Sequence, residues 1–513
     1  MRLSPATLCN VPVRTWTWLT EPAPPVRQRG FYIAVTLAVV VAFVGFRVHL
    51  GTPVFPVDDA YITLHNAVSL RDGHDVNYPG TSPLVGATSA VHLLIVALFT
   101  LVLPPLEALY TVTWLGILGW TLALARMAFV HGASIARAAL LVAVGVLVAK
   151  TPHQLLNGLE TGMAMGALAW TLAEASDRAP RHPWRVPALC GLFPFLRPEL
   201  VVASGFILAV HAVRSARKTV GLGARLRALG SDLGIALAYA APWLLWYLVA
   251  TGHPWPTTVG AKRVFFAEGC LPAALRWAWI RTTVHRWTDT LEYFSRSVLL
   301  LTGTALGWAG LGFFGVFVGT YYTQFPGALG HYEQRYVYVT LPFLLYGVAS
   351  CLDRRRWLAA GATALLVVTL DQSIVAAPER WAEHQATCRF TRTELAPVAD
   401  WCRLHLPPNA RVLVHDAGYI AYGTRLHLID LVGLKTPGAV AFHQRYTVPT
   451  CGAGRGEAVH QIALRAHPDY LVVLRAWDEI YRITESLHAR GWRLDPLYGH
   501  DRQYIVYKLT PPQ

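Results

Sequence analysis

Charged residues are scarce in this chain. Only 14% of its 513 residues are Asp, Glu, Lys or Arg, and 54% are hydrophobic, whereas soluble proteins carry about 25% charged residues. This composition excludes an ordinary water-soluble protein. Two other signatures are missing: the seven cysteines include no C-x-x-C pair, and no G-x-x-x-x-G-K-[ST] sequence occurs. The sequence therefore predicts neither a zinc or iron–sulfur site nor a nucleotide loop of that type.

Acidic residues are the scarcer charged class, with 30 Asp and Glu against 44 Lys and Arg, so the formal net charge is +14. A nucleic-acid partner is nevertheless not expected, because the basic residues form no continuous patch. They gather in short runs between apolar blocks, at 178–185, 214–227 and 354–356. Such runs are typical of the cytoplasmic loops that orient membrane helices.

Apolar blocks recur along most of the chain and predict an α-helical polytopic membrane protein. We expect residues 1–30 to be a cytoplasmic N-terminal segment and residues 31–377 to be a membrane domain of about ten spans. The first external loop is then 51–85. The expected spans are 31–48, 86–103, 106–126, 133–149, 158–174, 186–213, 231–250, 296–321, 335–352 and 357–377.

Two of these blocks are irregular. Pro194 and the sequence Arg197-Pro-Glu199 interrupt the block at 186–213, and the block at 296–321 is rich in glycine. Either could be a bent span, a helical hairpin or a re-entrant pair, because broken backbone at membrane depth persists only where protein or a cavity satisfies it. We assume a hairpin at 296–321, which reconciles the sides of the flanking loops.

After residue 377 the pattern becomes that of a soluble α/β domain, predicted for 378–513. Strands are expected at 411–415, 426–431, 469–474 and 503–509, and helices at 416–422, 457–466 and 481–490. The basic run at 354–356 places this domain outside the cytoplasm. Cys388, Cys402 and Cys451 lie in it, and one disulfide could form among them in an oxidising compartment; an inert buried thiol is the alternative.

The first external loop contains two adjacent carboxylates, Asp58 and Asp59, directly after the first span. Ionisable groups so close to the hydrocarbon are candidates for function. One could act as general base on a hydroxyl while the other orients it or holds a divalent cation, Mg²⁺ or Mn²⁺. The alternative is that both cap the helix that begins near Ala60.

Further polar groups interrupt apolar segments at Asn157–Thr161, Arg197–Glu199 and His331–Tyr336. An arginine at membrane depth suits a phosphate, because its guanidinium donates to two oxygens at once. Arg197 could instead pair with Glu199, and the 331–336 segment could be an interfacial anchor. Lys262 and Arg263 follow a Pro- and Trp-bearing loop that suits either a sugar platform or an interfacial aromatic belt.

These motifs, in this order, resemble the polytopic glycosyltransferases of the GT-C type, and among them the bacterial members that include arabinofuranosyltransferases. The motifs are Asp58-Asp-Ala-Tyr-Ile-Thr63, Asp72-Gly-His74, Gly158-Leu-Glu-Thr161, Arg197-Pro-Glu199, Pro256-Thr-Thr258 before Ala261-Lys262, His331-x-x-x-Arg335-Tyr336, Asp416-Ala-Gly-Tyr-Ile-Ala-Tyr422 and Ile429-Asp-Leu-Val-Gly-Leu434. The resemblance spans about residues 31–440. The chain departs from the pattern at Glu333, which stands in His-Tyr-Glu-Gln-Arg-Tyr, and at Asn77-Tyr-Pro-Gly80.

The resemblance implies transfer of a hexose or pentose from a polyprenyl-phosphate carrier to a glycan, lipid or protein acceptor of the cell envelope. The reaction would occur at the outer face of a bacterial inner membrane. In that family an Asp of the first external loop is the base, and we favour Asp58 over Asp59. Inversion at the anomeric carbon follows from a single displacement. A transporter or flippase of lipid-linked sugars is the alternative.

The expected site comprises three sets of residues. The catalytic residues, which are also the metal ligands if a metal binds, are Asp58 and Asp59. The donor-phosphate ligands are Arg197, Arg335, Lys262, Arg263 and His331. The other substrate-binding residues are Tyr61, His65, His74, Asn157, Glu160 and Glu199. Trp401, Tyr419 and Tyr422 could offer stacking surfaces to an acceptor, although such large aromatics more often belong to a core.

Overall fold

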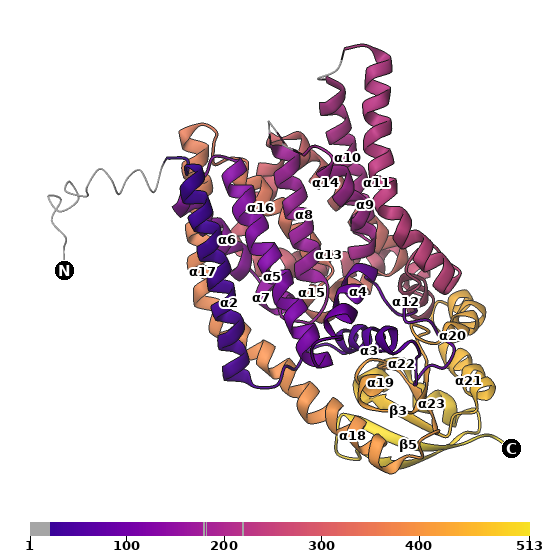
Figure 1. Cartoon of the computed structure of the whole chain (residues 1–513). Helices are drawn as coiled ribbons and strands as arrows, with labels where there is room; N and C mark the ends of the chain where they lie inside the picture. Colours follow the sequence, from indigo (N-terminus) through magenta and orange to yellow (C-terminus); the bar gives the residue numbers. More distant parts are fainter. Residues whose placement is uncertain (1–20, 178–179, 181, 218–219) are drawn as a thin grey trace.

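The computed structural model describes residues 21–177, 180, 182–217 and 220–513 (Figure 1). A bundle of helices forms one part, and a small α/β domain at its lower end forms the other. The bundle elements are α2 (Pro25–Leu50), α3 (Asp58–Asp72), α4 (Ala90–Phe99), α5 (Pro105–Val130), α6 (Ile135–Leu147), α7 (Thr151–Leu155), α8 (Thr161–Ser176), α9 (Arg185–Leu196), α10 (Leu200–Arg217), α11 (Leu222–Thr251), α12 (Thr258–Phe266), η2 (Glu268–Cys270), α13 (Ala273–Leu291), η3 (Glu292–Gly303), α14 (Ala305–Gln324), η4 (Pro326–Gly330), α15 (His331–Gln334), η5 (Val337–Thr340), α16 (Leu341–Ala349) and α17 (Arg356–Phe390).

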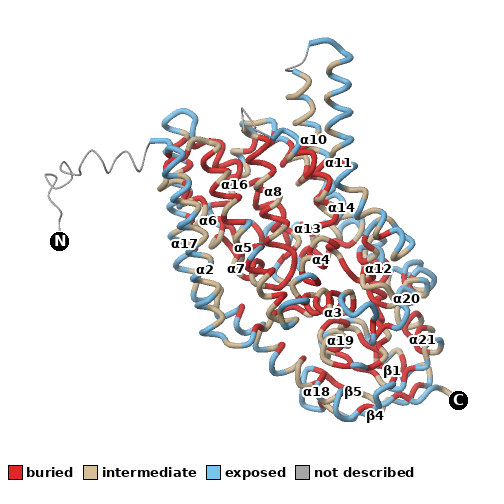
Figure 2. Tube along the Cα trace, viewed as in Figure 1, coloured by how far each residue is buried: buried red, intermediate tan, exposed pale blue. Residues whose placement is uncertain are grey.

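Six of the described helices are long and apolar enough to cross a membrane, and four shorter apolar helices accompany them. The protein is thus a multi-pass membrane protein. The outermost helices have the exposed apolar surface that is expected of helices facing lipid. No residue of α2 is fully buried, and Figure 2 shows α2 and much of α17, at the edge of the bundle, as exposed or partly exposed. Apolar side chains on such helices face lipid rather than water.

Both irregular blocks are divided in the structure. The block at 186–213 is a helical hairpin: α9 ends at Leu196, α10 begins at Leu200, and the Ser204 hydroxyl donates to the Cys190 carbonyl across the fold at 2.7 Å. The block at 296–321 breaks at Thr304, whose hydroxyl accepts from the Gly307 N–H and caps α14. In the first case the break carries Arg197 into the bundle.

The described residues of the basic runs at 214–227 and 354–356 lie at the opposite end of the bundle from the α/β domain. The end of α10, the start of α11 and the start of α17 are at the upper end in Figure 1, whereas α3 and the α/β domain are at the lower end. The helix α17 continues past the expected boundary at 377, through Pro378 to Phe390. The two parts are therefore joined by a continuous helix rather than by a linker.

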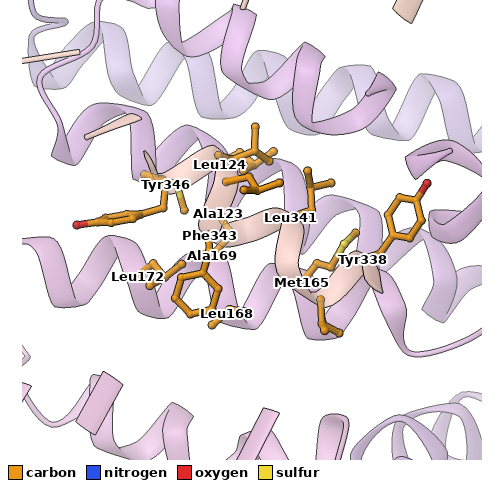
Figure 3. Close-up of a cluster of buried hydrophobic side chains, with 14 of the residues drawn as sticks. Ala123, Leu124, Met165, Leu168, Ala169, Leu172, Tyr338, Leu341, Phe343 and Tyr346 are labelled. Carbon is orange, nitrogen blue, oxygen red and sulfur yellow. The ribbon is translucent and has the colours of Figure 1, made fainter. Parts of the chain in front are cut away.

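Helices α5 and α8 pack closely at the centre of the bundle, together with α16 (Figure 3). The contact depends on small residues. A Cβ on Gly166 would lie 2.9 Å from the Trp120 backbone nitrogen, and one on Gly116 would lie 3.1 Å from that of Met163. Gly162 and Gly166 form a G-x-x-x-G pair on α8, a spacing that lets two membrane helices approach closely.

The α/β domain contains one five-stranded sheet in the order β2-β1-β3-β5-β4. Strands β1, β2 and β3 are parallel to one another, while β5 is antiparallel to β3 and to β4. The elements are α18 (Ala396–His405), β1 (Arg411–Val414), α19 (Tyr419–Gly423), β2 (His427–Asp430), α20 (Pro437–Phe442), α21 (Arg455–Ala466), β3 (Tyr470–Leu474), α22 (Arg475–Tyr481), α23 (Ile483–His488), β4 (Arg493–Tyr498) and β5 (Tyr504–Thr510).

Sequence patterns located four of these strands and missed β4. This strand is at the edge of the sheet, contains Pro496 and has no buried residue, so it lacks the apolar signal of a core strand. The helix expected at 481–490 is shorter, because Arg482 takes a left-handed conformation between α22 and α23.

The disulfide prediction was wrong about the partner. Cys451 is bonded to Cys270, which follows α12, whereas Cys388 and Cys402 are free thiols. The sequence separation is 181 residues, and both the membrane domain and the α/β domain contribute a cysteine. The sequence does not reveal this pair, because disulfide connectivity depends on which cysteines meet in the tertiary structure.

We predict that Gly166→Val separates α5 from α8 and lowers the midpoint of thermal unfolding of the detergent-solubilised protein. The overpacking cost is about 1–3 kcal/mol. Gly205→Val on α10 is the matched control, because no atom lies within 4 Å of a Cβ placed there. Equal melting of the two variants would contradict the close-packing interpretation.

Candidate functional site

Helix α3 lies between the membrane bundle and the α/β domain, and Asp58 attaches it to the latter. Its two carboxylate oxygens accept from the backbone N–H groups of Gly418, at 2.8 Å, and Tyr419, at 2.7 Å. A Cβ at position 418 would overlap the Asp58 carbonyl oxygen, so glycine is required there. Burial, with the nearby Asp416 charge, raises the pKa of Asp58 well above its usual range, although the two N–H groups oppose this. Asp58 thus has a docking role.

A second contact fastens the same external loop to the α/β domain. The Lys435 ammonium, fully buried, donates to Asp75 at 3.0 Å and to Asn66 at 2.6 Å. His65 lies in this network, 3.1 Å from Asn77 and 3.4 Å from Asp75. Because an unpaired buried charge is costly, this network makes the position of α3 depend on the α/β domain.

Asp59 points the other way, toward two cations supplied by distant segments. Its Oδ2 lies 2.5 Å from Arg335 Nη2 and 3.4 Å from Lys262 Nζ. The Tyr336 hydroxyl contacts the same two cations, at 2.8 Å from Arg335 and 3.3 Å from Lys262. One carboxylate, one phenol and two cations therefore form a single cluster.

Electrostatics keep this cluster charged. Burial alone would raise the pKa of Asp59, but Lys262 and Arg335 outweigh it and hold that pKa well below its usual range. Burial alone would lower the pKa of Lys262, but Asp59 and Tyr336 raise it overall. At neutral pH Asp59 is thus a carboxylate and Lys262 an ammonium.

Arg197 forms a second cationic point nearby, at the turn between α9 and α10. It is 2% exposed and lies 3.1 Å from Glu199 and 3.4 Å from Glu160. The Tyr321 hydroxyl donates to Glu199 at 3.1 Å. The ion pair that the sequence raised as an alternative role for Arg197 is therefore present. Arg197 also faces the ring of Tyr336 at 5.5 Å, which links it to the first cluster.

Both groups line one cavity of about 280 Å³. Its polar end carries Asp59, Arg335, Lys262 and Arg197. Its apolar walls come mainly from α10 and α14 and include Val201, Val202, Phe317 and Phe325. Val201 is 53% exposed, so this side of the cavity is open at the bundle surface. The cavity suits an amphiphile that has an anionic head and an apolar chain.

The segment before Arg335 has an unusual backbone. Tyr332, Glu333 and Gln334 all have positive φ, at 45°, 57° and 60°. Each such residue costs on the order of 1–3 kcal/mol and persists only where its surroundings hold it. We call residues 332–334 the left-handed segment. It aims the Arg335 guanidinium at Asp59.

Helix α7 and the residue before it hold this segment. The buried Gln154 amide donates to the carbonyls of Tyr332 and Glu333, at 3.1 and 3.2 Å. The Lys150 ammonium lies 2.7 Å from Glu333 and 2.8 Å from Glu383 of α17. These contacts tie the segment to two helices of the bundle.

The structure brings six of the expected site residues to the cavity and leaves seven away from it. Those lining it are Asp59, Glu160, Arg197, Glu199, Lys262 and Arg335. Those not lining it are Asp58, Tyr61, His65, His74, Asn157, Arg263 and His331.

Each residue away from the cavity has another environment. Tyr61 accepts from the Phe55 N–H, and Asn157 bonds Gln154 and the Leu159 N–H. Arg263 and His74 are exposed, and the His331 ring packs edge-on against Phe266. Burial, with the Arg335 and Lys262 charges, lowers the pKa of His331 to about 4, so its ring is neutral.

Two aromatic residues of the site were missed. Tyr336 belongs to the His331-x-x-x-Arg335-Tyr336 motif, and its place directly after Arg335 is the sequence signal that could have identified it. Tyr321 lay in a glycine-rich span. Its spacing of four from Phe317 and from Phe325 places one aromatic face on the α14 side of the cavity.

The two aspartates are not arranged as a metal site. Both oxygens of Asp58 accept backbone N–H groups, and Asp59 is paired with two cations. Within the described residues, no group of three or more His, Cys, Asp or Glu is placed to hold a metal ion. These donors do not fit the divalent cation that the sequence raised.

A family described as a domain of unknown function (DUF8728) matches residues 380–507, which lie in the α/β domain and the end of α17. No curated protein matches the chain. Among solved structures, ArnT from Cupriavidus metallidurans bound to undecaprenyl phosphate is 13% identical, with a TM-score of 0.54 over 94% of this chain and 98% of that one.

The oligosaccharyltransferase of Archaeoglobus fulgidus in complex with Zn and sulfate is 11% identical, with a TM-score of 0.48 over 92% of this chain and 72% of that one. The full-length match to ArnT shows that this chain has the GT-C fold. That agrees with the resemblance seen in the sequence motifs.

We predict that Gln154→Ala raises amide hydrogen exchange across the left-handed segment by at least about tenfold, because the carbonyls of Tyr332 and Glu333 lose the donor that holds them. Lys150→Met should raise it only a few-fold, because its carboxylate partners are partly exposed. Lys508→Met, at an exposed position of β5, is the control. Unchanged exchange in Gln154→Ala would show that other contacts hold the segment.

Proposed function

We propose that this protein is a membrane glycosyltransferase that moves a sugar from a polyprenyl-phosphate donor to an acceptor of the bacterial cell envelope. The acceptor is a glycan, a lipid or a protein, and transfer takes place at the outer face of the inner membrane, where the α/β domain lies. The observation that carries this proposal is one cavity whose polar end gathers three cations beside the Asp59 carboxylate and whose apolar walls are open at the bundle surface. Glu160 and Glu199 also line it, and both pair with Arg197. ArnT, which shares the fold, was solved with undecaprenyl phosphate bound.

The cationic end offers hydrogen-bond donors for a phosphate. Arg335 Nη1 and Arg197 Nε are buried and donate to no side chain or backbone atom of the described residues. A buried donor without an acceptor costs about 1–3 kcal/mol, which an anionic oxygen would recover. Lys262 adds a third positive charge at the same end. Together these groups would stabilise the negative charge that grows on the departing phosphate.

Asp59, rather than the initially favoured Asp58, is the base in this proposal. Asp59 lines the cavity, whereas Asp58 uses both oxygens to hold Gly418 and Tyr419. The Asp59 carboxylate would accept the proton of the acceptor hydroxyl as its oxygen attacks the anomeric carbon. The bond from that carbon to the phosphate oxygen breaks, its electron pair stays on the phosphate, and the configuration inverts.

The cluster also accounts for how the base is released. Before the donor binds, Asp59 is strongly paired and therefore weakly basic. A donor phosphate competes for Arg335 and Lys262, so it weakens their hold on Asp59 and raises the basicity of that carboxylate. Donor binding thus prepares the base for the acceptor.

We predict that Asp59→Asn lowers kcat for sugar transfer by roughly 10²–10⁴-fold, because the amide cannot accept the proton. Donor binding should persist or strengthen, since the two cations are freed. Asp58→Asn is the matched neighbour and should mainly destabilise the contact with the α/β domain. The assay follows a radiolabelled sugar from polyprenyl phosphate into lipid or polysaccharide. Sugar transfer at the normal rate by Asp59→Asn would rule out Asp59 as the general base. Movement of the lipid-linked sugar across the membrane without formation of a glycosidic bond would favour a transporter.

The pH profile gives an independent check. The pKa of Asp59 is lower in the folded protein than in the unfolded chain. Its carboxylate form is therefore fully present above the unfolded-chain pKa, and it is lost only when the pH falls through the lower pKa of the folded protein. The glycosyl donor is a phosphodiester and does not titrate near neutrality. We therefore expect kcat/KM to show no acid limb from Asp59 above about pH 5. Lys262→Met should raise the Asp59 pKa and move the acid limb of the kcat/KM profile to higher pH. An acid limb at the same pH in this variant would contradict the pairing of Asp59 with Lys262.

A further inference from the structure

A second cavity, of about 220 Å³, lies at the outer end of α2 and shares no residue with the cavity that holds Asp59. The end of α2, the extended residues 51–55, the start of α5, the outer part of α17 and the following η6 (Thr391–Leu395) enclose it. None of the expected site residues lies in it.

The walls of this cavity divide into an aromatic side and a basic side. Phe46, Tyr110 and Trp381 are on the first, and the rings of Phe46 and Trp381 meet edge-on at 5.4 Å. On the second are Arg389 and Arg392, which are exposed and three residues apart, so they occupy one face of the helix.

Charge in the cavity is of one sign. A third arginine, Arg47, lines it and pairs with Glu107 at 2.7 Å, but Glu107 is not a lining residue. No carboxylate is among the described lining residues, and no carboxylate of the part of the chain that the structure describes forms an ion pair with Arg389. The Arg392 guanidinium donates to the Thr52 backbone carbonyl at 3.5 Å.

The position of the cavity matches the level of lipid head groups. Helix α2 exposes its apolar side chains along its length and reaches the cavity at its last turn. Tryptophan and tyrosine beside arginine are the side chains that gather where a membrane helix leaves the hydrocarbon. An amphiphile could therefore enter along α2 without leaving the bilayer.

The cavity is also connected to the catalytic loop. From α17 and η6, the Cys388 thiol donates to the Val54 carbonyl at 3.5 Å and the Thr391 hydroxyl to the Phe55 carbonyl at 3.1 Å. The Phe55 N–H in turn donates to the Tyr61 hydroxyl on α3. The basic wall thus borders the segment that leads directly into Asp58 and Asp59.

We propose that this cavity binds the phosphate head group of an anionic membrane lipid, which Arg389 and Arg392 hold and which braces residues 52–55 before α3. The aromatic wall receives the glycerol and upper chain region, and the arginines donate to the phosphate oxygens. A neutral lipid lacks the net charge that the arginines select. This site is independent of the proposed transferase activity, because it contains none of the residues assigned to the donor or to the base.

The test uses the full chain in nanodiscs and then in detergent. Native mass spectrometry counts retained phosphatidylglycerol against phosphatidylcholine, and Arg389→Gln/Arg392→Gln is compared with the wild type. We expect the double variant to bind phosphatidylglycerol roughly thirtyfold more weakly. The control is Arg482→Gln/Arg493→Gln, which removes two exposed arginines of the α/β domain and should leave retention unchanged.

Two further arms separate the sources of phosphate and the effect on the loop. Inorganic phosphate at millimolar concentration should displace little phosphatidylglycerol, because it lacks the apolar contacts; full displacement would assign the site to free phosphate and overturn the lipid proposal. Amide exchange at residues 52–57 should slow with phosphatidylglycerol in the wild type only. Equal lipid retention by the arginine variant and the wild type, or equal exchange with and without the lipid, would also overturn it.

Discussion

The arrangement of this protein depends on one carboxylate that is shared between two cations. Asp59 is partly buried between the helix bundle and the α/β domain, where an isolated charge is unfavourable, and Arg335 and Lys262 neutralise it at 2.5 and 3.4 Å. The three residues come from α3, from the segment before η5 and from α12, so the ion cluster requires all three elements to converge. The apolar walls from α10 and α14 then complete a cavity whose charged end is already assembled.

Asp58 and Asp59 are adjacent in the sequence but face different sides of α3. Successive residues of a helix project about 100° apart, so Asp58 and Asp59 cannot share one environment. Asp58 holds the backbone of Gly418 and Tyr419 in the α/β domain, and Asp59 faces the cavity. Docking of the α/β domain and orientation of the Asp59 carboxylate are consequently coupled. The buried Lys435–Asp75 pair strengthens that coupling, because separating the α/β domain from the external loop would leave each of these charges without its partner.

The strained backbone before Arg335 shows what tertiary contacts can maintain. Three consecutive non-glycine residues with positive φ would not persist in an isolated peptide. They persist here because Gln154 binds two of their carbonyls and Lys150 links Glu333 to α17. The motif around Arg335 was visible in the sequence, but its dependence on α7 was not, since the residues lie about 180 positions apart.

The amino-acid sequence by itself determined the fold class, because bilayer thickness and apolar run length are directly comparable, and it determined most strands of the α/β domain through their apolar pattern. It also located the break at Arg197, indicated an irregular backbone somewhere within 296–321, and gave the residue types of the cationic end. Only the tertiary structure decided which aspartate faces the cavity, that Cys270 bonds Cys451, and that His65, Asn157 and Arg263 lie elsewhere. The reason is physical: hydropathy acts along the chain, whereas ion pairing, disulfide geometry and burial are set by which distant segments meet.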